Sequence, residues 1–442
     1  MIPRLFLILG LLLTPLVSHA AVFNPQSFTL ANGLQVVVIE NHRSPIVSHM
    51  VWYKVGDADA PWGLSGMPHL LEHLMFKGTN SVGPGLFSKI VARNGGRDNA
   101  FTGSDFTAYY QNIAASRLEL VMKMEADRMA NLVLDPKLIE TERKVVLEER
   151  RSRTDNDPAA RLREKMGAAQ YERHPYRNPV IGWEADIRAI KPADLQAFYR
   201  TWYAPNNAIL IVAGDVTLAE VRRLSETYYG PLPARDVRDR KRPDEPPLKG
   251  PKRVELRDMA VRQPLFLKEY RAPSRRLDAL KQSHALEVLE MILSGGATSR
   301  LYESLVVKSK LAASAGASYN AESFDWSEFG FYASPNPGVS MDRLEAALEA
   351  QIAHLLAEGV SEQEVARAKT RLIDGAVYAR DSLSTGSYAL GRALGTGQSI
   401  DDIESWPERI GAVTADEVNA AIKSVLVEKN AVLGLLLSET KP

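Results

Sequence analysis

A proline-rich segment divides this chain of 442 residues into two halves of similar length, and this division constrains the fold more than any other feature. The prolines of the segment are Pro231, Pro233, Pro243, Pro246, Pro247 and Pro251. Dense charge and the lack of an apolar period are typical of a linker. Because the chain is too long for one ordinary hydrophobic core, we expect domains at 21–230 and 253–442, joined by a linker at 231–252.

The two halves repeat the same order of sequence patterns near their ends. In the first half, a helix that begins at Pro192-Ala193-Asp194-Leu195 leads into the apolar run at 206–212. In the second half, a helix that begins at Thr414-Ala415-Asp416-Glu417 leads into the apolar run at 430–435. We interpret this as an internal duplication; the alternative is chance similarity of short segments.

Hydrophobic periodicity predicts strands and helices in both halves. In the first half, strands are expected at 34–40, 46–55, 98–102, 107–113 and 208–213. Helices are expected from about Ser65 and at 86–93, 116–131, 136–154, 159–171 and 192–202. In the second half, strands are expected at 254–257 and 265–270, followed by a helix at about 279–293. This mixture indicates an α+β fold.

The strongest chemical signal is the pentapeptide His69-Leu70-Leu71-Glu72-His73. Two histidines four residues apart lie on one face of a helix, and Glu72 points toward the same pocket. Neutral imidazoles so placed can hold Zn²⁺, which lowers the pKa of a bound water to about 7, and a glutamate can then take the proton. The order His-x-x-Glu-His is that of an inverzincin. The alternative is a pair of buried, hydrogen-bonded histidines on an apolar helix.

Such a zinc site needs a third protein ligand, and the best donor lies on the helix expected at 136–154. Glu142 and Glu149 are two helical turns apart and share a face, while Glu148 is the neighbour most easily mistaken for Glu149. The alternative is that these glutamates and the arginines between them form a solvated helix face. The chain contains no cysteine, so a metal site must use His, Asp and Glu.

Together these motifs make the chain similar to the M16 peptidase family, the group of pitrilysin and the mitochondrial processing peptidase. In that family, His-x-x-Glu-His is followed about 75 residues later by a helix reading Glu-Arg-x-Val-x-x-x-Glu, which here is Glu142–Glu149. The resemblance implies His69, His73 and Glu149 as metal ligands and Glu142 as the accompanying catalytic-site glutamate, orienting a ligand or its helix. It also implies two homologous α/β-sandwich halves, of which the second lacks metal ligands.

The resemblance implies a zinc endopeptidase that acts on unstructured peptides enclosed between the two halves, with Glu72 as the general base. The segment 95–102 also resembles the family, in which the strand beside the metal lies at a sheet edge. Substrate is therefore expected to pair with the backbone of this strand, at Asn99, Ala100 and Phe101.

The second half keeps the scaffold but not the ligands. Aligning 284–293 with the motif helix places Glu287, Glu290 and Met291 where the first half has His69, Glu72 and His73, in that order. We therefore expect one half to do the chemistry and the other to help in binding.

The chain departs from the family pattern at a pair of substrate-clamping residues. The family has an arginine and, seven residues later, a tyrosine; the matching positions here are Val306 and Ala313, whose side chains donate no hydrogen bond. Arg300 and Tyr302 belong to the ordinary pattern of this helix. Unless the alignment is locally displaced, this chain is expected to be the metal-bearing subunit of a heterodimer, whose homologous partner supplies the clamp.

The first residues have the pattern of a secretory signal peptide, predicted at 1–20. Arg4 is followed by the apolar run 5–13 and by Ser18-His19-Ala20, with cleavage expected after Ala20. The run is short for a membrane crossing, although an uncleaved anchor is the alternative, and no stable membrane insertion is expected after cleavage. Export without cysteine favours the periplasm. Lys+Arg and Asp+Glu are equal at 54 each, which provides no basic field to attract nucleic acid.

Two other functions compete with a peptidase. A non-catalytic scaffold or binding subunit, like the core proteins of the respiratory chain, has the same kind of fold, but it has no use for intact His69, Glu72, His73 and Glu149. A zinc enzyme that acts on a non-peptide amide or ester is the other alternative. Mn²⁺ or Co²⁺ can also occupy a site with two histidines and one glutamate.

Overall fold

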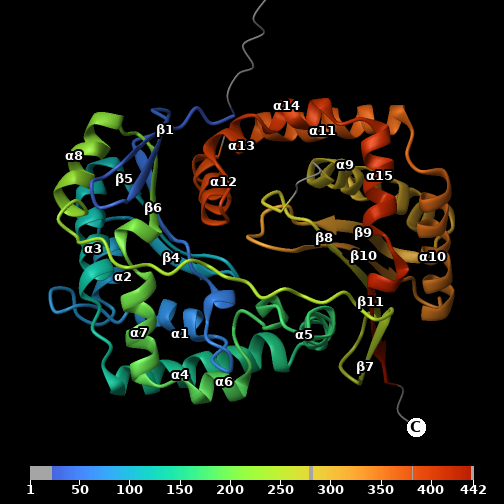
Figure 1. Cartoon of the computed structure of the whole chain (residues 1–442), viewed down its shortest axis with the longest axis horizontal. Helices are drawn as coiled ribbons and strands as arrows, with labels where there is room; N and C mark the ends of the chain where they lie inside the picture. Colours follow the sequence, from blue (N-terminus) through green and yellow to red (C-terminus); the bar gives the residue numbers. More distant parts are fainter. Residues whose placement is uncertain (1–21, 278–281, 381, 440–442) are drawn as a thin grey trace, which may run out of the picture.

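The structure is a computed structural model, which describes residues 22–277, 282–380 and 382–439. It consists of two halves that face one another, each built from a β-sheet and packed helices (Figure 1). The signal peptide predicted at 1–20 lies outside the described residues, as does the first turn of the helix expected from 279. No helix in the described part of the chain has both the length and the hydropathy that a membrane crossing requires.

The first sheet contains six strands in the order β1-β2-β6-β3-β5-β4. Their bounds are β1 (Gln26–Thr29), β2 (Gln35–Glu40), β3 (Ile46–Tyr53), β4 (Arg97–Thr102), β5 (Thr107–Ala114) and β6 (Ala208–Gly214). β2 and β6 are parallel, and every other neighbouring pair is antiparallel. The strand with Asn99, Ala100 and Phe101 is β4, which lies at the edge of the sheet.

The second sheet repeats the topology of the first without its outermost strand. Its five strands follow the order β7-β11-β8-β10-β9, and β7 and β11 are parallel as β2 and β6 are. Their bounds are β7 (Lys252–Asp258), β8 (Leu265–Ala272), β9 (Ala312–Tyr319), β10 (Ser327–Pro335) and β11 (Ala431–Ser438). The repeated order confirms the two duplicated α/β halves, and it makes β9 the counterpart of β4.

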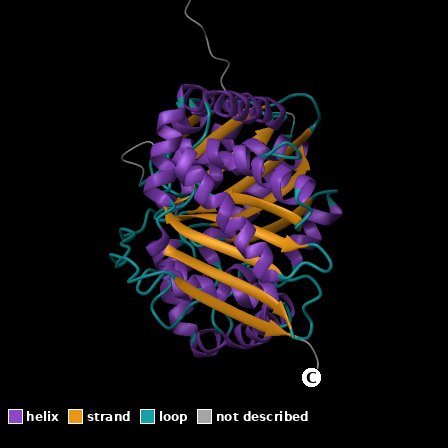
Figure 2. Ribbon diagram, turned by 90° about the vertical axis from the view of Figure 1, so that its right-hand side faces the viewer, coloured by secondary structure: helices purple, strands orange, loops and turns teal. Residues whose placement is uncertain are grey.

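Helices pack against both sheets (Figure 2). In the first half these are α1 (Met67–Leu74), α2 (Leu86–Arg93), α3 (Leu118–Asn131), α4 (Pro136–Arg150), α5 (Pro158–Gln170), α6 (Glu184–Ala189), α7 (Pro192–Trp202) and α8 (Leu218–Tyr228). In the second half they are α9 (Gln282–Ser294), α10 (Met341–Glu358), α11 (Glu362–Ala379), α12 (Leu383–Gly395), α13 (Ile400–Glu404), α14 (Trp406–Ala412) and α15 (Ala415–Val425). Each half has its own large apolar core between sheet and helices.

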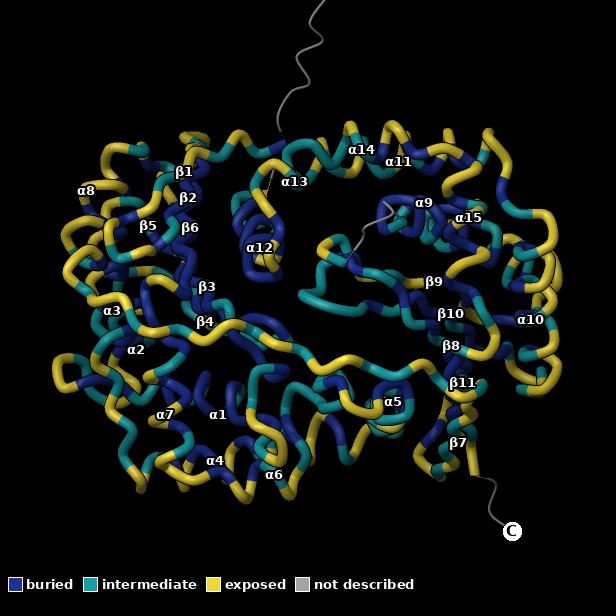
Figure 3. Tube along the Cα trace, viewed as in Figure 1, coloured by how far each residue is buried: buried dark blue, intermediate teal, exposed yellow. Residues whose placement is uncertain are grey.

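One helix of each half packs on the sheet of the other half. α12 packs on β3 and β6 of the first sheet and is largely buried there (Figure 3), whereas α5 packs on β7 and β11 of the second. Glycine permits both close approaches: a Cβ on Gly391 of α12 would lie 2.0 Å from Cε2 of Trp52, and one on Gly434 of β11 would lie 2.1 Å from the Met166 sulfur. The exchange ties the two halves together.

The segment 231–251, which the structure describes throughout, contains neither helix nor strand. It crosses from the first half to the second as an extended chain (Figure 1). Its charged side chains are bound to both halves, as the contacts of Arg240 and Arg242 show below. We call segment 231–251 the strap, because its side-chain contacts fix it to both halves.

Candidate metal centre

The motif pentapeptide lies on α1, whose start is set by its sequence. Gly66 adopts a left-handed conformation with φ of 81°, and Pro68 occupies the first turn, where a missing backbone N–H is tolerated. The helix is anchored in the core by Met67, Leu70, Leu71 and Leu74. His69 and His73 occupy the face that this leaves toward α4.

Glu149, in the last turn of α4, lies opposite both histidines. Its Oε2 is 3.3 Å from Nε2 of His73 and 3.8 Å from Nε2 of His69. One ligand atom from each of the three side chains lies within 4.8 Å of the others. The structure thus brings together His69, His73 and Glu149, whereas Glu148 is 65% exposed and pairs with Arg151.

This donor set fits a divalent metal ion. Two imidazole nitrogens and one carboxylate oxygen are the ligands of catalytic zinc sites, which keep a fourth position open. Burial and the neighbouring His73 lower the pKa of His69 to about 4, so that its ring is neutral and free to act as a ligand. The hydrogen bond with His73 keeps the pKa of Glu149 below its usual value, and its carboxylate is charged.

His73 has a different electrostatic environment. Burial opposes a charge on its ring, but the hydrogen bond to Glu149 and the nearby Glu72 and Glu142 outweigh burial and raise its pKa. The ring of His73 therefore holds a proton more readily than a free imidazole does. A divalent ion would supply the same positive charge and compete with that proton.

Glu142 is not one of the three ligands but lies directly behind one of them. Its Oε2 is 3.4 Å from Nδ1 of His73, and its Oε1 is 2.8 Å from Nζ of Lys77. Glu142 is buried, so the lysine compensates its charge. This position allows it to hold the imidazole of His73 with Nε2 toward Glu149.

Glu72 lies in the same cavity as the histidines and accepts a hydrogen bond from Oγ1 of Thr102 at 2.5 Å. Burial raises the pKa of Glu72, although the Thr102 hydroxyl partly offsets the effect. A carboxylate of raised basicity is suited to accept a proton. Thr102 directly follows the strand residues expected to bind substrate, and no sequence pattern indicates its hydrogen bond to Glu72.

The three candidate ligands and β4 share one open cavity of about 870 Å³. Asn99, Ala100 and Phe101 line it from the strand side. On the other side, α4 continues beyond Arg150 as a π-helical turn (Arg151–Asp155) instead of the regular helix expected to 154. In this turn, Nη1 of Arg153 lies 2.5 Å from Oε1 of Glu149, the oxygen that does not contact His73.

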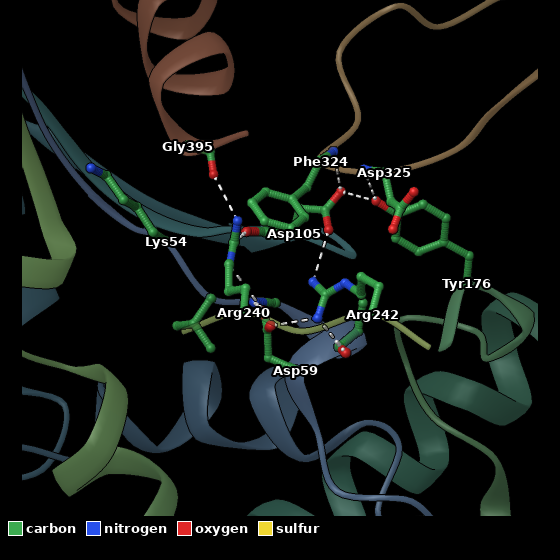
Figure 4. A network of polar contacts seen from close by, with 12 residues as sticks. Lys54, Asp59, Asp105, Tyr176, Arg240, Arg242, Phe324, Asp325 and Gly395 are labelled. Carbon is green, nitrogen blue, oxygen red and sulfur yellow. Dashed lines mark hydrogen bonds and ion pairs between the residues drawn. The ribbon is translucent and has the colours of Figure 1, made fainter. Parts of the chain in front are cut away.

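The two halves are joined near this cavity by a buried polar network centred on Asp105 (Figure 4). The Asp105 carboxylate accepts hydrogen bonds from the hydroxyl of Tyr176 at 2.6 Å, the backbone N–H of Phe324 at 3.0 Å and the guanidinium of Arg242 at 3.1 Å. Asp105 belongs to the first half, Phe324 to the second and Arg242 to the strap. One carboxylate therefore connects all three parts.

The two strap arginines complete this network. Arg242 pairs with Asp59 at 2.7 Å, and Arg240 donates to the backbone carbonyl of Gly395, at the end of α12, at 3.1 Å. The Arg240 guanidinium also lies over the Phe324 ring, 4.5 Å from its centroid. These contacts attach the strap to Asp59 of the first half and to Gly395 and Phe324 of the second.

The second half offers no comparable ligand set at the matching positions. Glu287, in the place of His69, is paired with Arg275 and accepts a hydrogen bond from Trp406 at 3.1 Å. Val306 packs against the second core, and Ala313 is exposed on β9. Neither residue can take the role of the arginine or the tyrosine of the family pattern.

The comparisons with known proteins agree with this architecture. Residues 35–184 match the family model described as "Insulinase (Peptidase family M16)", and residues 189–372 match "Peptidase M16 inactive domain". Together these segments cover most of the chain. The chain belongs to the M16 peptidase family.

Individual relatives extend this result. The chain is 35% identical over 356 residues, 79% of each protein, to the zinc protease PqqE of Helicobacter pylori. The crystal structure of a protease from the same organism superposes with a TM-score of 0.86 at 28% identity, covering 93% of this chain and 99% of that one. The first half of the periplasmic protease PqqL from Escherichia coli has the same fold, with a TM-score of 0.79 at 20% identity over 93% of this chain and 92% of that one.

Proposed function

We propose that this protein is a zinc-dependent endopeptidase that hydrolyses unstructured peptides. The observation that carries the proposal is the convergence of three possible ligand atoms, from His69, His73 and Glu149, next to the buried Glu72 and the edge strand β4. Relatives named zinc proteases support both the metal and the reaction.

The residues of the site then have distinct roles. Zinc held by the three ligands would polarise the scissile carbonyl and lower the pKa of the attacking water. Glu72 accepts the proton of that water and passes it to the leaving amine nitrogen. Thr102 holds the carboxylate of Glu72 in position through its hydrogen bond. Glu142 orients His73 from behind.

The peptide would bind as an added strand. β4 has no partner on its outer side in the described part of the chain, so its backbone groups at Asn99, Ala100 and Phe101 are free to pair with an extended substrate. Because β4 lines a cavity, the added strand has to be an extended segment that can enter it, which is why we expect unstructured peptides as substrates.

The decisive experiment compares the zinc-loaded protein with Glu72→Gln on a long unstructured peptide. Glu72→Gln should lower the cleavage rate by about 100-fold or more while zinc content stays the same, because general-base catalysis is lost and the ligands remain. Glu140→Gln, an exposed glutamate on α4, is the matched control and should cleave normally. Equal activity of Glu72→Gln and the unmodified protein would contradict the assignment, and a chelator-insensitive rate would contradict the metal.

We further propose that the active species is a heterodimer in the periplasm, exported by the signal peptide predicted at 1–20. The partner is a homologous chain that supplies the arginine and tyrosine missing at Val306 and Ala313. The paired substitution Val306→Arg with Ala313→Tyr should raise the activity of the isolated chain. The control, displaced by one residue, is Val307→Arg with Ser314→Tyr at exposed positions. Full activity of the unmodified chain alone would rule out the need for a partner.

The alternative of a non-catalytic scaffold predicts a different result. A scaffold would assemble with its partner equally well in all these variants and would release no peptide fragments from any of them. The intact ligand set favours the enzyme.

A further inference from the structure

A second cavity, of about 490 Å³, lies in the second half of the chain, and we call it the α9–α11 cavity. It is bounded by the end of α9, by the loop and the π-helical turn (Tyr302–Lys308) that follow α9, and by one face of α11. The helices α9 and α11 pack side by side (Figure 1). The residues that line this cavity are all different from those of the metal cavity, so the two sites are separate.

The internal duplication explains why this space exists. Extending the alignment of α9 with the motif helix places Gly295 where the first half has Lys77. Counting from the N-caps of α4 and α11 places Ala368, which lines the cavity, where the first half has Glu142. Lys77 and Glu142 form an ion pair behind the metal ligands. Glycine and alanine have no side chains that could fill the corresponding space in the second half.

Two arginines of α11 line this cavity without a carboxylate partner. Arg367 forms no ion pair or hydrogen bond with any of the described residues. Arg371 lies one turn later on the same face of the helix. Its guanidinium donates only to neutral groups, the backbone carbonyl of Gly295 and Oγ1 of Thr298. Neither positive charge is therefore compensated by an ion pair within the described part of the chain.

The other charged groups that line the cavity are already paired. The guanidinium of Arg300 donates to both carboxylate oxygens of Glu364, at 2.5 and 2.8 Å. Glu303 is exposed and pairs with Lys308 at 2.9 Å. Because these pairs are neutral as wholes, the two unpaired arginines give the cavity an excess of positive charge.

Hydroxyl groups add uncharged donors to the same cavity. Ser299 lines it and is 4% exposed, and its Oγ has no hydrogen-bond partner among the described residues. A buried hydroxyl without a partner is unfavourable, because it has lost its bonds to water. The adjacent Thr298 hydroxyl accepts the bond from Arg371 at 3.1 Å and can donate its own hydrogen elsewhere. Two hydroxyl groups and two guanidinium groups therefore border one space.

We propose that the α9–α11 cavity binds a phosphate group, held by Arg367 and Arg371 and by the hydroxyl groups of Thr298 and Ser299. The site goes beyond the proposed peptidase function and does not depend on it. Phosphate has several oxygens that accept charge-assisted hydrogen bonds from different directions, and guanidinium groups match their geometry. A carboxylate has only two oxygens, which one arginine can satisfy, and would leave the second arginine unpaired.

The test is isothermal titration calorimetry of the mature protein with inorganic phosphate at constant ionic strength. Binding should be saturable, with one phosphate per chain. Arg367→Gln and Arg371→Gln should each raise the Kd about tenfold, because each removes one charged donor. Both side chains are exposed on α11, so neither substitution disturbs the core. Arg343→Gln, an exposed arginine of α10 outside the cavity, is the matched control and should leave the Kd unchanged.

Ser299→Ala tests the buried hydroxyl without changing the charge. It should raise the Kd of phosphate about threefold, a smaller effect than either arginine substitution because a neutral donor forms a weaker bond. Thermal unfolding provides a second measurement: phosphate should raise the Tm of the unmodified protein and of Arg343→Gln, and should have less effect on the two α11 variants. Circular dichroism establishes that each variant is folded.

Other ligands identify the source of the phosphate group. Glycerol 3-phosphate that binds more tightly than inorganic phosphate would identify a phosphate monoester as the ligand, and weaker binding would identify free phosphate. Acetate that binds as tightly as phosphate would overturn the choice of phosphate. The absence of both a saturable heat and a phosphate-dependent rise in Tm would overturn the site, and so would equal Kd values in the unmodified protein and both α11 variants.

Discussion

Oε2 of Glu142 lies 3.4 Å from Nδ1 of His73, on the side of the ring away from Nε2, which faces Glu149. A carboxylate in this position fixes the ring orientation and makes the metal-facing nitrogen a better ligand. Glu142→Gln keeps the shape but removes the charge, so we expect roughly tenfold weaker zinc binding, at the low end of the usual range. Competition with a fluorescent zinc chelator measures it.

Glu140→Gln is the control for this experiment, because Glu140 lies on the same helix but is 61% exposed and pairs with Arg143 instead. Its zinc affinity should equal that of the unmodified protein. An unchanged affinity in Glu142→Gln would mean that Glu142 serves only its ion pair with Lys77.

The adjacent glutamates Glu148 and Glu149 provide a second prediction. Glu149 faces both histidines and is 15% exposed, whereas Glu148 points to solvent and is 65% exposed. Glu149→Ala should therefore lose stoichiometric zinc after dialysis, and Glu148→Ala should retain it. Metal content by mass spectrometry of the dialysed proteins decides between them, and the reverse pattern would transfer the ligand role to Glu148.

Local sequence patterns indicate which side chains of the candidate metal centre share a face, because the elements that carry them are mostly helical. The spacing of His69 and His73 fixes their common face within one helix, and the same holds for Glu142 and Glu149 on α4. For these two pairs, one short helix contains the whole signal. The choice of Glu149 as the third ligand and the edge position of β4 rest on the family resemblance.

The contacts between the halves were not predictable in this way. Asp105 meets the backbone of Phe324 across 219 residues, and Gly391 on α12 packs against Trp52 on a strand of the other half. Such pairings depend on how complete elements dock, and no periodicity within either segment encodes them.

The Asp105 network predicts a large effect on stability. Asp105→Ala removes the acceptor for Tyr176, Phe324 and Arg242 and leaves buried positive charge uncompensated, which should cost about 3–5 kcal/mol in the free energy of unfolding. Tyr176→Phe removes two hydrogen bonds, the one donated to Asp105 and the one accepted from the backbone N–H of Asp325, and should cost about 2 kcal/mol. Urea titration followed by tryptophan fluorescence measures both.

Asp239→Ala is the control, since Asp239 is exposed on the same strap. Its unfolding curve should match that of the unmodified protein. If Asp105→Ala unfolds at the same urea concentration as this control, the network does not hold the halves together. If the unfolding transition of Asp105→Ala instead splits into two, then the network of the unmodified protein couples the unfolding of the two halves as well as stabilising them.

Asp57 predicts a pH dependence of stability. It is buried before the motif helix, where one carboxylate oxygen accepts the Gly66 backbone N–H at 2.6 Å and the other has no partner among the described residues. Burial is the main cause that raises its pKa to about 8, with Asp59 and Asp186 adding to the effect. Because the folded protein holds this proton more tightly than the unfolded chain, the stabilisation is complete below about pH 4 and is lost as pH rises toward 8.

Asp57→Asn keeps an acceptor for Gly66 and removes the titration. The difference in unfolding free energy between this variant and the unmodified protein should therefore shift in favour of the variant from pH 5 to pH 8, with a slope of roughly 1.4 kcal/mol per pH unit. Above the folded-state pKa the difference should level off, since Asp57 is then ionised in both states. Urea unfolding at several pH values gives the slope, and a difference that does not change with pH would show that Asp57 is already ionised in the folded protein at pH 5.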